Sequence, residues 1–245
     1  MARIVYDARA AAGFQAAREV PREGLDGWRD AITRHMSPRP GMTVVDVGAG
    51  TGAFSTAIHD WFGVAVVAVE PSEAMRTLIP HTTGIEILAG SAEELPINDS
   101  TVDGAWLSTV THHITDLPAA ATELRRVLRP GAPVLIRNFF PGRTQRIGLL
   151  RFFPEVRRVF STFPTVEQTT AAFATAGFSL QATESVPQQT APSLAAIAAK
   201  LDRNADTALQ SLSDAEFAAG MTRLRAAATR EHDPVVDYLE LLVLR

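Results

Sequence analysis

Five short apolar runs, separated by helical segments, dominate residues 42–139. Alternation of strands and helices implies crossover connections and a parallel sheet. The runs are continuously apolar, as expected where helices cover both sheet faces. Such a sheet binds ligands beyond the carboxyl ends of its strands. The expected strands are residues 42–47, 64–69, 85–88, 102–107 and 134–139, and the expected helices are 53–62, 117–128 and one that starts after Ser72, a fitting N-cap.

The flanking segments follow a different pattern. Within residues 1–40, four apolar residues recur at helical spacing before Pro38 and Pro40 end the helix. They are Leu25, Trp28, Ile32 and Met36. After residue 139 we expect a helix at 166–176, a strand at 178–186, two or three Ala-rich helices within 188–231, and a last strand at 235–244. The chain contains no repeat or low-complexity linker, which predicts one domain.

The segment between the first strand and its helix is rich in glycine. Residues 44–52 read VVDVGAGTG, so Gly48, Gly50 and Gly52 alternate with Ala49 and Thr51. Glycine lets the backbone turn sharply and approach a ligand closely. Glu70 ends the second strand, where a carboxylate can accept hydrogen bonds from both hydroxyls of a ribose. Together they predict an adenosine-containing ligand. The loop also fits the pattern G-x-G-x-x-A, so alone it leaves a nicotinamide dinucleotide open.

Three later segments help to decide which adenosine-containing ligand binds. The chain reads SAEELP at 91–96, VDGAW at 102–106 and ELRRVLRPG at 123–131. With the glycine loop, these segments resemble the class I S-adenosylmethionine-dependent methyltransferases, in the branch of the ubiquinone/menaquinone biosynthesis enzymes and many small-molecule enzymes. The resemblance is strong over 42–139, weaker over 165–186 and the last strand, and nearly absent over 1–40 and 187–232. It implies a Rossmann-like, doubly wound α/β fold, with seven mostly parallel strands and an antiparallel last strand.

The resemblance also implies roles for individual residues in binding S-adenosylmethionine. The glycine loop would line the methionine and ribose, Asp46 would brace that loop, and Glu70 would hold the ribose diol. Ser108 would lie beside the methionine part. The adenine would lie between Pro71 and Met75 and meet the segment of Ser91, Ala92 and Glu93 at its edge. Ala132 departs from the pattern, since relatives often have a second glycine there.

Candidates for chemistry on the acceptor follow the fourth and fifth strands. His112 and His113 are adjacent, and one could act as a base or positioning group for an oxygen acceptor. In an extended segment only one could face the pocket. The alternative is that both cap or pack the next helix. Further candidates are Tyr6 and Arg18 in the N-terminal cap, and three residues at or after the end of the fifth strand, where an arginine could bind an acidic substrate: Arg137, Asn138 and Arg143.

Composition excludes several other classes. The net charge of −4 gives no general reason to bind nucleic acid. The chain has no cysteine and no convincing metal-ligand set, so we expect no metal. No apolar run approaches the roughly 20 residues of a membrane span, and residues 1–22 lack a signal-peptide core. A reducing cytosol is the simplest compartment.

We therefore expect S-adenosylmethionine-dependent methyl transfer to an oxygen, nitrogen or carbon of a small, hydrophobic metabolite. Residues 1–40 would be a helical cap, 42–139 the cofactor-binding half, and 140–164 with 187–232 a substrate lid or a homodimer interface. The aromatic stretch 147–163 favours the lid. Two alternatives remain: a methyltransferase-like protein without methylating activity, and a nicotinamide-dependent oxidoreductase. The latter lacks a Tyr-x-x-x-Lys pair, because Lys200 is the only lysine.

Overall fold

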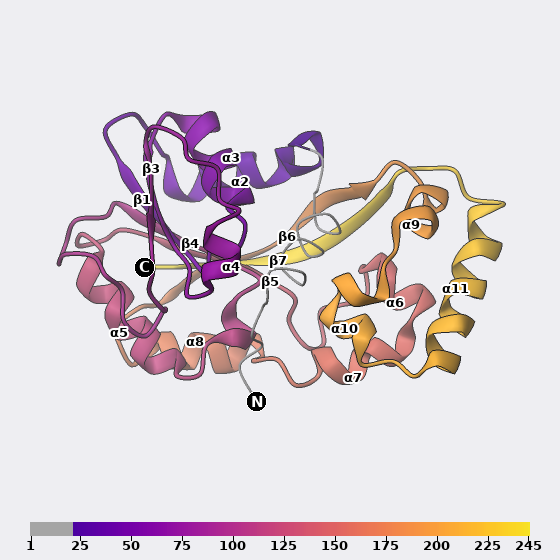
Figure 1. Cartoon of the computed structure of the whole chain (residues 1–245). Coiled ribbons are helices and arrows are strands. Elements are labelled where there is room, and N and C mark those ends of the chain that lie inside the picture. Colours follow the sequence, from indigo (N-terminus) through magenta and orange to yellow (C-terminus); the bar gives the residue numbers. More distant parts are fainter. Residues whose placement is uncertain (1–21) are drawn as a thin grey trace.

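A computed structural model describes residues 22–245 and contains one seven-stranded sheet (Figure 1). The strand order is β3-β2-β1-β4-β5-β7-β6. The first five strands and β6 run in one direction, and β7 is antiparallel to both of its neighbours. This arrangement confirms the expected fold class. The strands are β1 (Thr43–Val47), β2 (Ala65–Val69), β3 (Ile85–Leu88), β4 (Gly104–Ser108), β5 (Val134–Asn138), β6 (Leu180–Ala191) and β7 (Val235–Leu244).

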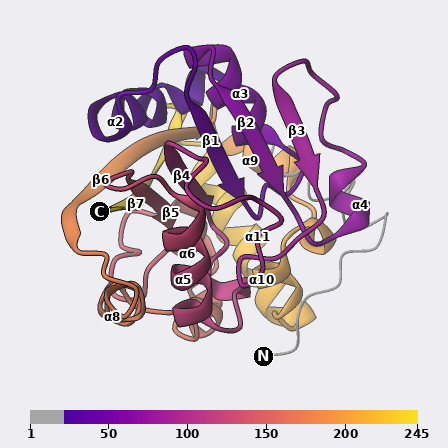
Figure 2. The same cartoon turned by 90° about the vertical axis from the view of Figure 1, so that its left-hand side faces the viewer.

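Helices cover both faces of this sheet (Figure 2). On one face lie α2 (Asp26–Met36) and α3 (Ala53–Phe62), and on the other lie α5 (Leu117–Val127) and α8 (Val166–Ala174). The apolar stripe of α2 is buried as expected, with Trp28 against Trp106 of β4 at a ring distance of 5.9 Å. The central strands are therefore buried on both sides, which explains their continuous apolar sequence.

Side-chain caps define where several helices begin. The Ser72 hydroxyl accepts the Met75 N–H at the start of α4 (Glu73–Arg76), as expected. Asp116 caps α5 in the same way. Thr165 and Ser213 each form a reciprocal capping box, at the starts of α8 and α11 (Asp214–Ala228). These short polar residues satisfy N–H groups that have no partner within the helix.

The remaining helices form a separate lobe at the end of the long β6–β7 pair (Figure 1). Residues 140–164 contribute α6 (Gly148–Phe152), the short turn η3 (Pro154–Val156) and α7 (Arg157–Phe160). The segment before β7 contributes α9 (Leu194–Lys200), η4 (Arg203–Ala205), α10 (Thr207–Gln210) and α11. We call residues 140–164 and 192–232 together the helical lobe.

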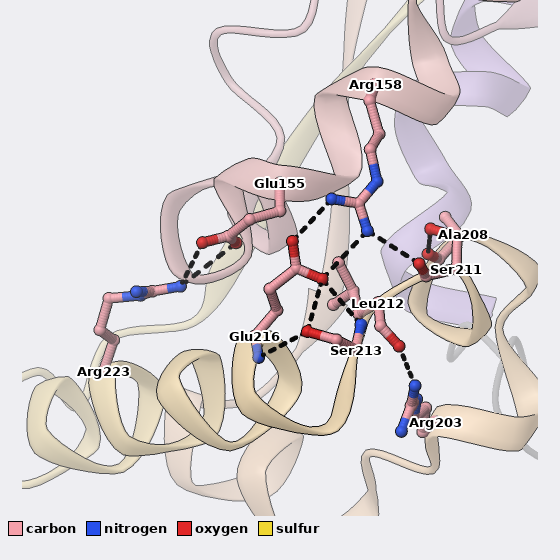
Figure 3. Close-up of polar contacts among 9 residues, drawn as sticks. All are labelled: Glu155, Arg158, Arg203, Ala208, Ser211, Leu212, Ser213, Glu216 and Arg223. Carbon is pink, nitrogen blue, oxygen red and sulfur yellow. Dashed lines mark hydrogen bonds and ion pairs between the residues drawn. The ribbon is translucent and has the colours of Figure 1, made fainter.

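An apolar core and surface ion pairs join the two segments of the helical lobe. Phe153 is fully buried and stacks on Phe217 at 5.7 Å. Arg158 forms two hydrogen bonds with the Glu216 carboxylate, 2.7 and 3.1 Å long (Figure 3). Arg223 pairs with Glu155 at 3.3 Å. The two segments, far apart in sequence, thus pack as one unit.

Some sequence-based boundaries were wrong. The strand expected at 178–186 is β6, which runs from Leu180 to Ala191, so the expected insertion at 187–232 begins about five residues later. Pro187 lies within β6, which is possible because an edge strand needs hydrogen bonds on only one side. The fourth strand begins at Gly104, and Val102 makes only an isolated bridge with Leu128.

Candidate functional site

The glycine loop forms a tight turn between β1 and α3. Gly48, Gly50 and Gly52 have φ angles of 70°, 58° and 79°, a region that favours glycine. A Cβ atom on Gly48 would lie 2.4 Å from Val110, and one on Gly52 would lie 2.7 Å from Ile79. A Cβ atom on Gly50 would meet nothing within 4 Å. The outer glycines therefore allow close packing, whereas the middle glycine borders open space where a ligand could approach the backbone.

Glu70 lies across from this middle glycine. The Gly50 N–H donates to one carboxylate oxygen of Glu70 at 2.9 Å, and the Ser72 N–H donates to the other at 2.9 Å. Arg76 donates to the carbonyl oxygens of Glu70 and Pro71, both at 2.8 Å, and so fixes the turn after β2. Each Glu70 oxygen has more than one lone pair, so these bonds leave acceptor capacity for a diol.

Asp46 lies beneath the loop and is almost fully buried. Its carboxylate accepts a 2.6 Å hydrogen bond from the Ser55 hydroxyl of α3. Burial raises the pKa of Asp46 to about 7, and the nearby negative charge of Glu70 contributes in the same direction, although the Ser55 hydrogen bond opposes both. Asp46 thus ties the strand before the loop to the helix after it, which fits the bracing role expected from the sequence.

The expected adenine-binding residues lie along the same edge of the sheet. Met75 is buried, and Pro71 is exposed at the end of β2. Ala92 belongs to the apolar cluster that includes Val47 and Val69, the last residues of β1 and β2. Ser91 bridges to Glu94 and begins this turn.

Glu93 has a contact that its sequence position does not reveal. Its carboxylate accepts the Thr115 N–H at 2.9 Å and so holds the loop that follows the two histidines. Burial acts to raise the pKa of Glu93, but the hydrogen bonds from Thr115 and other donors outweigh burial and lower it. The carboxylate is therefore suited to stay ionised. Its expected contact with adenine remains a prediction.

Ser108 is linked to a buried arginine at the end of β5. Arg137 donates to the Ser108 hydroxyl at 3.0 Å and to the Gln188 side-chain carbonyl at 2.6 Å. The Trp28 N–H donates to the same Gln188 oxygen at 2.9 Å. Sequence analysis missed Trp28 and Gln188 as partners because they are 160 residues apart and match no local motif.

A half-buried carboxylate of β7 anchors the helical lobe nearby. Asp237 accepts the Gly148 N–H at 2.6 Å, at the start of α6. Burial raises the pKa of Asp237, while this hydrogen bond and the charge of Arg137 act to lower it. By contrast, Arg143 pairs with Glu240 at 3.1 Å and lines a surface hollow with Arg146 and Tyr238. Arg137 is thus the arginine that contacts Ser108, one of the expected cofactor residues.

The two histidines lie in a helical turn after β4, η2 (Thr111–His113), so the condition of an extended segment, under which only one could face the pocket, does not apply. Their rings contact one another, with centroids 4.0 Å apart. The His112 ring also stacks on Phe163 of the helical lobe at 4.0 Å and 8°. Asn138 donates to the Thr111 hydroxyl and thereby joins this turn to β5. The turn therefore lies between the sheet edge and the helical lobe.

Further expectations concern the N-terminal cap, metal binding and membrane spans. Tyr6 and Arg18 lie outside the described residues. Within residues 22–245, no group of three or more His, Asp or Glu side chains could hold a metal ion. Over the same range, we find no helix with the length and apolar character that crossing a membrane requires.

Comparison with known proteins identifies the domain. Residues 45–136 match the family model of a methyltransferase domain. The chain is 32% identical over 148 residues to demethylmenaquinone methyltransferase of Corynebacterium kroppenstedtii, covering 58% of this chain and 64% of the relative. It is 31% identical to malonyl-acyl-carrier-protein O-methyltransferase of Serratia marcescens, covering 57% and 53%. The chain thus spans about half to two thirds of the length of these curated relatives.

Solved structures share the fold over most of the chain. A protein of Anabaena variabilis, assigned as an antibiotic-pathway methyltransferase, has a TM-score of 0.68 at 21% identity and covers 93% of this chain and 99% of its own. The 4+2 cyclase SpnF has a TM-score of 0.63 at 18% identity, covering 94% and 83%. Geranyl diphosphate C-methyltransferase of Streptomyces coelicolor, solved with S-adenosyl-L-homocysteine, has a TM-score of 0.57 at 16% identity, covering 89% and 78%.

These structural likenesses concern the fold, whereas the sequence match concerns the family. The matched segment runs from β1 to β5 and includes the glycine loop, Glu70 and the histidine turn. The expected resemblance is confirmed: residues 45–136 are a methyltransferase domain.

Proposed function

We propose that this protein transfers the methyl group of S-adenosylmethionine to a small, largely apolar acceptor. The observation that carries the proposal is the pairing of Gly50 with Glu70. The Gly50 N–H fixes the carboxylate 2.9 Å away, while the space beside the Gly50 Cα is open. A ribose could therefore approach the loop and donate its hydroxyls to Glu70. The family match over residues 45–136 supports the same reaction.

The charges around the loop suit this cofactor. S-adenosylmethionine carries a sulfonium and an ammonium group, and it supplies the electrophilic methyl carbon for an in-line displacement. The Asp46 and Glu70 carboxyl groups are close enough for the charge of Glu70 to raise the pKa of Asp46. A cationic ligand near the loop would lessen that repulsion. Met75, Pro71 and Ala92 would contact the adenine, and Ser108 the methionine part.

On the acceptor side we favour His112 over His113. The ring of His112 contacts Phe163, and the helical lobe that contains Phe163 is our candidate for the wall of the acceptor pocket. If the acceptor atom is an oxygen, a histidine base would contribute about 10²–10⁴ in rate. The aromatic residues of the lobe favour an apolar acceptor. The residues of this chain would thus bind, orient and deprotonate, while the cofactor supplies the reactive carbon.

A second candidate function is suggested by one neighbour. SpnF has this fold and is a cyclase, so a non-methylating role on the same scaffold is a defined alternative. A protein with such a role would still bind the cofactor but would transfer no methyl group.

Calorimetry and a labelled methyl group together test the proposal. We expect S-adenosylhomocysteine to bind and NAD to give no heat. With a panel of small, largely apolar acceptors, label from methyl-labelled S-adenosylmethionine should appear in one product class. NAD binding without a response to S-adenosylhomocysteine would contradict the proposal. Tight S-adenosylhomocysteine binding, with product formed from an acceptor but no label in it, would favour the non-methylating alternative.

A further inference from the structure

A continuous row of aromatic rings connects the helical lobe to the histidine turn. Phe139, directly after β5, stacks on Phe160 at 5.3 Å and 6°. Phe160 contacts Phe163 at 5.5 Å, and Phe163 stacks on His112 at 4.0 Å and 8°. The first ring of this row is attached to the sheet, the next two belong to the lobe, and the last is the candidate base.

Other contacts hold both members of the Phe163–His112 stack in place. Phe160 is buried in the apolar core of the lobe, and the Phe163 N–H donates to the Phe160 carbonyl at 3.1 Å. On the opposite side, the hydrogen bond from Asn138 to Thr111 ties the histidine turn to β5. The Glu93 carboxylate holds the backbone just after this turn. The His112 ring therefore contacts Phe163 of the lobe as well as its neighbour His113, and it lies on a turn whose backbone is anchored by Asn138 of β5 and by Glu93.

We propose that Phe163 is a positioning residue that orients His112 for the reaction, so that the helical lobe controls the geometry of the base. The inference rests on the proposed function, in which His112 faces the acceptor. Parallel rings 4.0 Å apart restrict rotation of the imidazole and cover one of its faces. As a base, His112 would engage the acceptor through a nitrogen at its ring edge. Because the contact comes from the lobe, movement of the lobe away from the sheet would release His112.

The expected cost of losing the stack is a loss of turnover with cofactor binding retained. A misplacement of about 1 Å in a catalytic group can cost about 10²-fold in rate. We therefore expect Phe163→Leu to lower kcat by about tenfold or more and to leave S-adenosylhomocysteine affinity unchanged. Phe163→Tyr keeps an aromatic face and should retain most of kcat. Phe62→Leu, another half-buried phenylalanine whose ring contacts Trp61, is the matched control and should keep kcat.

A double-mutant cycle separates positioning from general damage. If Phe163 acts through His112, then Phe163→Leu should cost nothing further in a His112→Ala background. Equal losses in the two backgrounds would overturn the inference, because they would show that Phe163 acts independently of His112.

Nuclear magnetic resonance of labelled histidine gives a readout that does not depend on activity. The ring current of Phe163 should shift the His112 ring protons upfield, and this shift should disappear in Phe163→Leu but not in Phe62→Leu. Unchanged His112 resonances in Phe163→Leu would overturn the inference and leave the proposed function intact. If the wild-type protein transferred no methyl group, the proposed function would fail, and the resonances would still decide whether Phe163 orients His112.

Discussion

Asp46 is the single residue with the clearest expected effect on pH dependence. Its pKa of about 7 in the folded protein lies above the value of about 4 for an unperturbed aspartate. Between these values the folded protein holds a proton that the unfolded chain has released. The contribution of Asp46 to the free energy of unfolding is therefore largest at low pH and falls as the pH rises from about 4 to 7.

Replacing this residue tests that argument. Asn cannot titrate, yet its carbonyl oxygen can still accept the Ser55 hydroxyl hydrogen bond. We expect Asp46→Asn to reduce the loss of unfolding free energy between pH 5 and pH 8, measured by urea denaturation. Asp30→Asn removes an exposed carboxylate of α2 and serves as the control. An identical loss in Asp46→Asn and wild type would show that Asp46 does not titrate in this range.

Glu70 should affect ligand binding more than folding. Its carboxylate accepts two backbone hydrogen bonds, so removal affects the loop as well as the ligand. We expect Glu70→Ala to weaken S-adenosylhomocysteine binding by about 1.5–3 kcal/mol, the range for hydrogen bonds to a charged group. Glu70→Gln, which keeps one acceptor oxygen, should lose less. Calorimetry is the measurement, and Glu73→Ala, an exposed glutamate of α4, is the matched control. Equal affinity in Glu70→Ala and wild type would remove Glu70 from the site.

At the scale of elements, boundaries were predictable where breakers enclose an apolar pattern. The helix expected at 53–62 matches α3, which follows Gly52 and ends at Gly63, and the strand expected at 235–244 matches β7. The edge strand β6 was predicted poorly, because its exposed side is polar and Pro187 interrupts it. Several lobe helices are only four or five residues long, which is too short to show a helical period.

The candidate site likewise contains local motifs that the sequence reveals and long-range contacts that it does not. The glycine loop, Glu70 and the histidine pair are local motifs, and they could be found from the sequence. The contacts of Arg137 with Gln188, and of His112 with Phe163, join residues about 50 positions apart. Such pairs depend on how the lobe packs against the sheet, and one sequence contains no signal for them.

One glycine in α11 is expected to control packing within the helical lobe. A Cβ atom on Gly220 would lie 2.2 Å from the ring of Phe153, which is fully buried. Alanine is the better helix former by about 1 kcal/mol, but overpacking a core costs about 1–3 kcal/mol. We therefore expect Gly220→Ala to destabilise the protein slightly, as measured by urea denaturation.

A second substitution tests whether a clash with Phe153 causes this destabilisation. Phe153→Leu shortens the side chain that would clash with the new methyl group. In that background, Gly220→Ala should be neutral or stabilising, because helix propensity then dominates. If Gly220→Ala destabilised both backgrounds equally, a clash with Phe153 would not be the reason.

For the whole molecule, the division between sheet and helical lobe predicts which part selects the acceptor. The proposed cofactor-binding residues lie at or after the carboxyl ends of β1, β2, β3 and β4. The lobe contacts this edge through the Phe163–His112 stack and through the hydrogen bond between Gly148 and Asp237. Its ion pairs are exposed, and such pairs contribute only about 0–1 kcal/mol each. Apolar packing between its two segments therefore holds the lobe together, and the segments must be exchanged together.

We expect a chimera that takes both 140–164 and 192–232 from a relative to bind S-adenosylhomocysteine as before and to adopt the acceptor preference of that relative. A chimera with only one foreign segment should unfold at lower urea concentration, because Phe153 would lose its fit to Gly220 and Phe217.

Exchange of α8, on the opposite face of the sheet from α2 and α3, is the control and should leave acceptor choice unchanged. Activity on acceptor panels and calorimetry measure the two properties separately. If the double chimera kept the original acceptor preference, the helical lobe would not form the acceptor pocket, and a homodimer interface, detectable by sedimentation, would become the better explanation of the lobe.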